Sequence, residues 1–75
     1  MLNFSDALDM MNNLETHRLS LGCSLDLFLS AERAIKKLWE KAIKDDAGKF
    51  IVSSQCEEWN TFNSIIKKTG LLNPT

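Results

Sequence analysis

Glycine, proline and histidine are scarce in this sequence, and it contains no long apolar run. Its 75 residues include three glycines, one proline and one histidine, so few residues interrupt the chain. No stretch approaches 18 consecutive apolar residues, and we therefore expect no transmembrane helix. The opening residues, MLNFSDALDMMNN, lack both a basic segment and a continuous apolar segment, so we expect no secretory signal.

Cysteine and histidine are too few and too far apart for a recognisable metal or catalytic site. Cys23 and Cys56 match no disulfide framework, which predicts free thiols in a reducing cytoplasm. Their spacing to His17 matches no zinc pattern. The segment KDDAGK, residues 44–49, lacks the spacing of a calcium loop and of a phosphate-binding loop, so we interpret it as a helix stop. No cofactor, metal or catalytic group is predicted, and the sequence does not indicate an enzyme.

Size and charge limit what the chain can do. The apolar share of 44% is that of a globular protein, but 75 residues build only a thin core, which a partner chain would stabilise. The net charge of −1 gives no overall attraction to DNA or to a membrane. Residues 31–49 hold six basic and four acidic side chains, so the positive charge is local and diluted.

The first predicted helix spans residues 5–21 and has an unusually wide apolar face. Ser5 is its candidate N-cap, and Gly22 follows its end. At 100° per residue, its apolar side chains cover about half of the helix circumference. Either this helix is covered on two sides, or part of its face meets another chain. The candidates for such an apolar contact are Met10, Met11 and Leu21.

The second predicted helix spans residues 24–45, begins at Ser24 and carries the clearest amphipathic pattern. Its apolar residues repeat at i, i+3, i+4 and i+7, which places Ile35 and Leu38 in the core. Gly48 is the candidate C-cap. Trp39 also lies on the apolar stripe, as Trp59 does on the third helix. Both fit a core position, and one could instead anchor a partner, since tryptophan is enriched at binding hot spots.

The third predicted helix spans residues 54–69 and completes the fold. Ser54 and Glu57 have the spacing of a capping box, and Gly70 marks the end before a short tail, residues 70–75. The preceding segment KFIVSS could form one strand, but a lone strand has no partner, so we expect a buried connection. The sequence thus predicts one all-α domain over residues 1–75, a compact three-helix bundle with short loops.

A cluster of basic side chains on the second predicted helix allows three interpretations. It is a solvated face, a contact for nucleic-acid phosphates, or a contact for an acidic protein. Because the apolar side chains beside it belong to the core stripe, it lacks the interleaved aromatic groups typical of single-strand binding. Membrane docking needs a free apolar face, which a three-helix core would consume. The candidate contact residues are Arg33, Lys36, Lys37, Lys41 and Lys44.

The sequence favours a small, non-enzymatic regulatory or accessory protein of the cytoplasm that acts by binding another protein. The evidence is the lack of catalytic groups, the thin core and the wide apolar face of the first helix. The alternative is a nucleic-acid-binding accessory protein that uses the basic face of the second helix. A homodimer is a further candidate assembly, and no membrane partner is expected.

Overall fold

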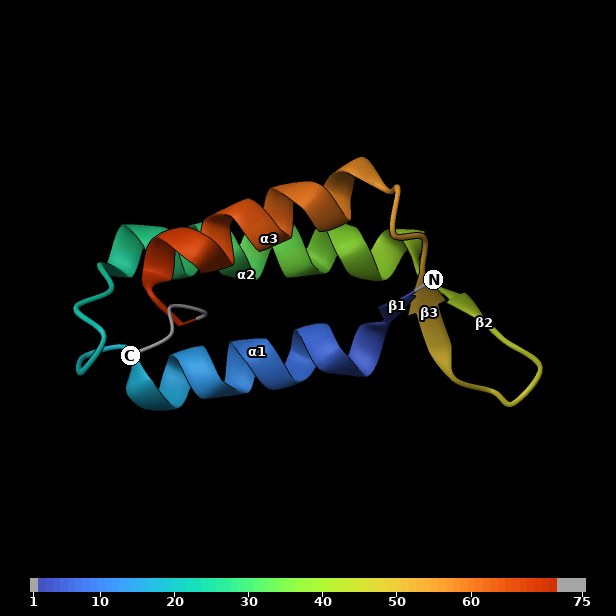
Figure 1. Ribbon diagram of the computed structural model, residues 1–75, viewed down its shortest axis with the longest axis horizontal. Helices are drawn as coiled ribbons and strands as arrows, with labels where there is room; N and C mark the ends of the chain where they lie inside the picture. Colours follow the sequence, from blue (N-terminus) through green and yellow to red (C-terminus); the bar gives the residue numbers. More distant parts are fainter. Residues whose placement is uncertain (1, 72–75) are drawn as a thin grey trace.

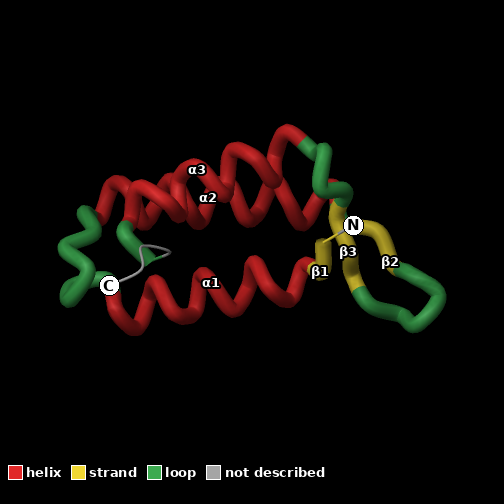
Figure 2. The backbone as a smooth tube through the Cα atoms, viewed as in Figure 1, coloured by secondary structure: helices red, strands yellow, loops and turns green. Residues whose placement is uncertain are grey.

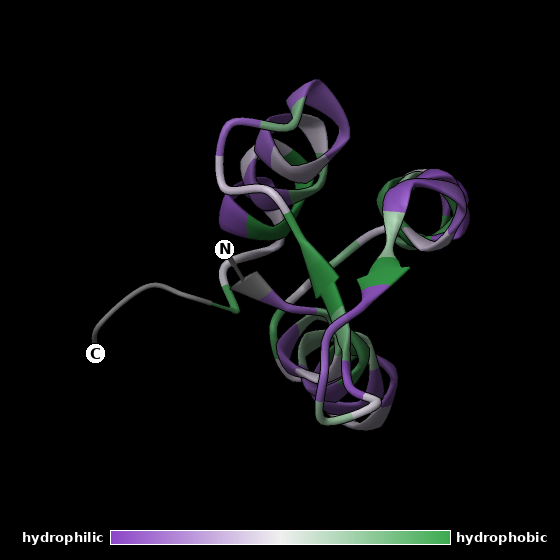
Figure 3. Cartoon of the chain, turned by 90° about the vertical axis from the view of Figure 1, so that its right-hand side faces the viewer, coloured by the Kyte–Doolittle hydropathy of each residue, from purple (hydrophilic) through white to green (hydrophobic). Residues whose placement is uncertain are grey.

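A computed structural model describes residues 2–71, and most of these lie in three helices (Figure 1). The helices run lengthwise, and three short strands lie together at one end (Figure 2). Seen from that end, the helices stand at the corners of a triangle (Figure 3). In chain order the elements are β1 (Leu2–Asn3), α1 (Phe4–His17), α2 (Leu25–Lys41), β2 (Ile43–Lys44), β3 (Phe50–Val52) and α3 (Glu57–Thr69).

Helix α1 starts one residue earlier than expected and loses its regular geometry sooner. Its N-cap is Asn3, not Ser5: the Asn3 side-chain oxygen accepts a hydrogen bond from the Ser5 backbone N–H at 3.0 Å. The regular helix ends at His17, and tighter turns follow as far as Gly22. There the Cys23 N–H donates to the Arg18 carbonyl at 3.0 Å while Gly22 has a φ of +71°. This is a glycine-closed helix terminus, so the predicted stop at Gly22 marks the end of the turns.

Helix α2 begins as predicted and ends earlier. The Ser24 hydroxyl caps it by accepting from the Leu27 N–H at 3.2 Å. The predicted end at residue 45 is wrong, because Ala42 has an extended backbone with a ψ of 142°. The next two residues, Ile43 and Lys44, form strand β2 instead of another helical turn.

The fold is mostly helical and compact, as predicted, but the expectation that it contains no sheet is wrong. Strand β3 lies between β1 and β2 and pairs antiparallel with both, so the apolar segment FIV has two partners. Residues 45–49 are the turn of the β2–β3 hairpin, and not a helix stop. The Asp45 N–H donates to the Lys49 carbonyl at 2.8 Å. This hydrogen bond closes a three-residue loop, residues 46–48. Gly48 supplies the positive φ of +80° that such a loop requires at its last position, so it is not a helix C-cap.

Helix α3 starts later than predicted. Its N-cap is Cys56, whose side chain makes no capping hydrogen bond, so the capping box of Ser54 and Glu57 is not formed. The predicted end is confirmed, since Gly70 is a left-handed C-cap with a φ of +84°. Leu71 packs partly buried against the core. The remainder of the predicted tail, residues 72–75, lies outside the described residues.

The core draws on all three helices and the central strand. Leu38 is fully buried, as predicted, whereas Ile35 is only partly buried. Trp59 is buried, but Trp39 has 48% of its surface exposed, so the core interpretation holds for only one tryptophan. The buried apolar residues are Phe4, Ala7, Leu14, Cys23, Ala31, Ala34, Leu38, Val52, Trp59, Phe62 and Ile66.

Candidate protein-interaction surface

Three aromatic rings meet where α1, α2 and the sheet come together. The Trp39 ring lies 5.1 Å from the Phe4 ring and 4.5 Å from the Phe50 ring, measured between centroids. Phe4 is buried and Phe50 is half-buried, whereas Trp39 has 48% of its surface exposed. The sheet positions this cluster, because β3 carries Phe50 and β1 leads directly into Phe4.

An apolar groove lies beside this cluster, between α1 and α2. We call it the Trp39 groove; it has a volume of about 530 Å³ and a rim formed by Lys36 and Glu40. Its apolar lining residues are Phe4, Leu8, Ile35 and Trp39.

The Trp39 groove continues in both directions. A neighbouring hollow of about 570 Å³ shares Phe4, Leu8 and Trp39 and extends to Phe50 on the sheet. A third, of about 270 Å³, follows the same two helices away from the sheet, where Met11 and Phe28 line it. The third hollow also carries polar side chains, whereas the Trp39 groove and the hollow toward Phe50 are largely apolar. A concave apolar surface of this kind is typical of a site that receives side chains of a partner.

Large apolar side chains are also exposed along α2 and just beyond its end. Leu25 and Leu29 have 56% and 41% of their surface exposed, and Ile43, just beyond the helix, has 55%. Ordinary proteins expose single leucines without consequence. Leu25 and Leu29 share one side of α2 with Trp39 by their helical spacing, and Ile43 lies just beyond the end of the helix.

The predicted apolar contact residues are not the most exposed ones. Met10, Met11 and Leu21 are partly buried and pack against the core. Of the three, Met11 lines one of the hollows beside the Trp39 groove. On α1 the exposed apolar residue is Leu8. The wide face of this helix is therefore divided between the core and the groove.

The five basic residues are all exposed, but the structure distributes them over three places. Lys36 lies at the rim of the Trp39 groove. The Lys44 ammonium lies 5.3 Å from the centre of the Phe50 ring. The other three, Arg33, Lys37 and Lys41, follow the side of α2 that meets α3.

Acidic residues of α3 accompany the basic ones on this side of α2. Glu57 and Glu58 line the same hollow as Lys37. The pKa of Glu58 is lowered, chiefly because the Cys56 thiol donates a hydrogen bond to its carboxylate at 2.9 Å, with a smaller contribution from Lys41 and Lys37. These carboxylates offset part of the positive charge that the sequence places on α2.

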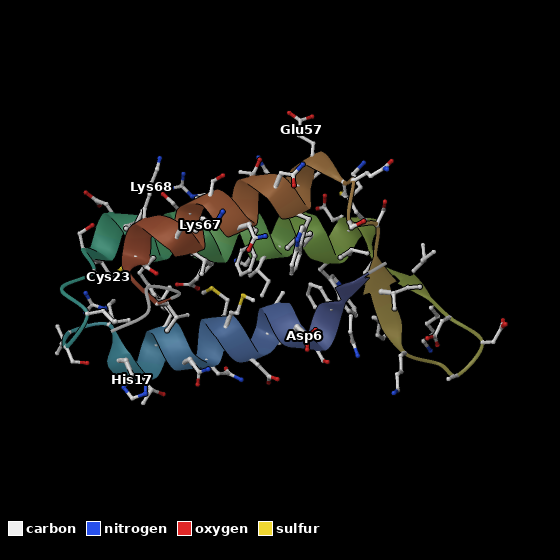
Figure 4. The ribbon with its side chains drawn as sticks, viewed as in Figure 1. Asp6, His17, Cys23, Glu57, Lys67 and Lys68 are labelled. Atoms are coloured by element: carbon white, nitrogen blue, oxygen red, sulfur yellow. The ribbon has the colours of Figure 1, made fainter. Side chains whose placement is uncertain are left out.

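His17 and the two cysteines are not brought together. His17 and Cys23 lie at the end of the molecule opposite the sheet, and Glu57, which follows Cys56 at the start of α3, lies apart from both (Figure 4). Cys23 is buried, and both thiols are free. Within residues 2–71, no three cysteine, histidine or acidic side chains are grouped so as to hold a metal ion.

Two further observations complete the description of the chain. Among the described residues, no helix combines the length and the apolar character needed to cross a membrane. Comparisons with protein-family models, with curated proteins and with solved structures find no match to the chain.

Proposed function

We propose that this chain is a small, non-enzymatic regulatory or accessory protein of the cytoplasm that acts by binding another protein at the Trp39 groove. The observation that supports this proposal is the half-exposed indole of Trp39 above an apolar groove. Exposing this surface to water is unfavourable, and burying it against a partner recovers about 25 cal/mol for each Å² of apolar area. Tryptophan in such a position is the residue type most enriched at binding hot spots.

The shape of the groove favours an elongated apolar segment as the bound part. The groove and its continuations follow α1 and α2 from Phe50 to Phe28, with charged groups at the rim. An amphipathic helix places apolar side chains at i, i+3, i+4 and i+7, which matches a groove of this form. The rim charges then contact the polar sides of that helix.

The test is affinity capture from a lysate of the native cell, with the wild-type protein and with Trp39→Ala as baits. We expect at least one protein to be retained by the wild type after nuclease treatment and to be lost with Trp39→Ala. Leu19→Ala is the matched control, because Leu19 has 82% of its surface exposed and lies in the turns after α1, away from the groove. The proposal fails if the wild type retains no protein, or if both variants retain the same proteins.

The alternative, nucleic-acid binding by the basic face of α2, predicts a different outcome. Its affinity would fall with salt at a slope of about −0.9 per phosphate neutralised on duplex DNA. We expect no useful affinity at physiological salt, because Glu57 and Glu58 accompany Lys37. A sub-micromolar complex that is lost in the Lys37→Glu/Lys41→Glu variant would favour this alternative over the protein-binding proposal.

A further inference from the structure

We infer that a second copy of this chain binds along the exposed side of α2 next to the Trp39 groove. The two α2 helices lie antiparallel about a two-fold axis. This inference rests on the proposed function, since it takes an identical chain as one protein that the exposed apolar surface binds. The contact surface, called the α2 stripe below, consists of Leu25, Leu29, Glu32, Lys36 and Trp39.

The α2 stripe has the spacing of a helix-pairing seam. Successive members are separated by four, three, four and three residues. This alternation keeps side chains on one side of a helix and is the repeat found where two helices pack along their length. The three apolar members are all exposed, by 56%, 41% and 48%.

Only part of the α2 stripe is used within the chain. Trp39 packs against Phe4 and Phe50. Glu32 and Lys36 line hollows shared with α1, whereas Leu25 and Leu29 are exposed. The buried residues of α2 are Ala31, Ala34 and Leu38, which point toward α1 and α3. In the end-on view α2 occupies one corner of the triangle of helices, so part of its circumference faces away from both others (Figure 3). A second helix would approach this exposed side next to the groove that α2 shares with α1.

The order of residues in the α2 stripe is self-complementary under a two-fold rotation. With the axis at the level of residue 34 along the helix, Glu32 of each chain faces Lys36 of the other, and Leu29 faces Trp39. The same rotation places Leu25 of one chain near Ile43 of the other, whose side chain is exposed just beyond the helix end. Each contact then occurs twice, as in every isologous interface.

Charge decides between the antiparallel and the parallel arrangement. A parallel pair would place Glu32 against Glu32 and Lys36 against Lys36, which is repulsive at both levels. The antiparallel pair replaces these repulsions by two attractive pairs at the centre of the contact. The two polar residues inside the α2 stripe thus set the direction of pairing, as single polar residues do in helical dimers.

Charge exchange combined with sedimentation equilibrium tests this arrangement. We expect the wild type to dimerise reversibly over roughly 10 to 500 µM, the range expected for a small interface. Glu32→Lys and Lys36→Glu should each weaken dimerisation about tenfold or more, because both central pairs become repulsive. An equimolar mixture of the two variants should form a heterodimer, and the Glu32→Lys/Lys36→Glu double variant should regain wild-type dimerisation.

A matched control separates pairing from net charge. Lys68→Glu, on the exposed surface of α3, changes the net charge as Lys36→Glu does, and it should leave dimerisation unchanged. A second readout is acrylamide quenching of tryptophan fluorescence. Quenching should fall with protein concentration as Trp39 becomes covered, while the buried Trp59 contributes a constant background.

Two results would overturn the inference. One is a monomer throughout the concentration range. The other is a dimer that neither charge reversal weakens, which would place the contact on another surface. In both cases the proposed function is judged separately, by whether Trp39→Ala loses the proteins that the wild type retains.

Discussion

At the residue scale, Leu38 and Trp39 are neighbours on α2 with opposite surroundings. Leu38 is fully buried, and Trp39 has 48% of its surface exposed. Consecutive helical residues point about 100° apart, so a stripe centred on Leu38 places Trp39 at its boundary. At this boundary the sequence does not distinguish core from groove, because the answer depends on how closely α1 approaches α2.

The core role of Leu38 gives the first prediction. Leu38→Ala should lower the free energy of unfolding by ~2–5 kcal/mol, through lost burial and the cavity left behind. Urea unfolding followed by circular dichroism measures this change. Leu25→Ala is the matched control, because Leu25 is at the exposed start of the same helix, and we expect a change within about 0.5 kcal/mol. A small effect of Leu38→Ala would contradict its central position in the core.

The Glu58 carboxyl group gives the second prediction. The Cys56 thiol donates a hydrogen bond to the charged carboxylate, which lowers its pKa in the folded state. A lowered folded pKa contributes stability above the unfolded pKa, and that contribution is lost as the pH falls through the folded pKa. NMR titration of the side-chain carboxyl should show a pKa below the ordinary value of 4.5.

The matched variants test the cause of this shift. Cys56→Ala removes the thiol donor, so the Glu58 pKa should rise toward its ordinary value. Cys56→Ser retains a donor and should keep the pKa low. An unchanged pKa in Cys56→Ala would show that the thiol hydrogen bond is not the main cause.

At the element scale, helices with strong local end signals could be predicted, but the sheet could not. Ser24 and Gly70 act through hydrogen bonds and backbone angles within a few residues, so sequence reveals them. Strand β1 instead pairs with β3, about fifty residues away along the chain. No local pattern reports such a pairing, and the two-residue strands are too short to show alternation.

Pairing with β3 in the hairpin also explains why the predicted end of α2 is wrong. Ile43 continues the apolar spacing of the helix, but its backbone pairs with Ile51 in the sheet. A signal for the hairpin was present, because Asp45 and Gly48 have the positions of the first and last residues of a type I turn between two apolar stretches. Of the candidate surface, the basic residues and exposed positions on α2 follow from its periodicity. The Trp39 groove does not, because it requires the packing of α1.

The hairpin turn gives the third prediction. One Asp45 carboxylate oxygen accepts hydrogen bonds from the Ala47 and Lys49 N–H groups, both at 2.9 Å. Asp45→Ala should therefore lower the free energy of unfolding by about 1–2 kcal/mol. Asp46→Ala changes the adjacent, exposed residue and should have a smaller effect, so equal losses in urea unfolding would contradict this role of Asp45.

At the scale of the whole molecule, the two helices that border the groove differ from α3, and α1 contrasts with it most clearly. Helix α1 buries only Phe4, Ala7 and Leu14, and it is connected to the sheet through β1. Helix α3, although one residue shorter, buries four residues. The free energy of opening a segment follows the contacts that its opening removes, so α1 should open more readily than α3.

This difference gives the fourth prediction. Native-state hydrogen exchange should show faster exchange in α1 than in α3. Asn3→Ala removes the N-cap of α1, which costs about 1 kcal/mol, and should accelerate exchange in α1 most. Asn13→Ala, an exposed change within the same helix, is the control. Equal acceleration in all three helices would indicate that the molecule opens only as one unit.

The central position of β3 has a consequence for the order of folding during synthesis. Leu2 is synthesised fifty residues before its partner Val52. At about 5–20 residues per second, this interval lasts roughly 3 to 10 s. Throughout it, α1 has neither its strand pairing nor the Phe50 ring that closes the aromatic cluster. We therefore expect the nascent chain to stay unfinished, and open to chaperones, until β3 has been made.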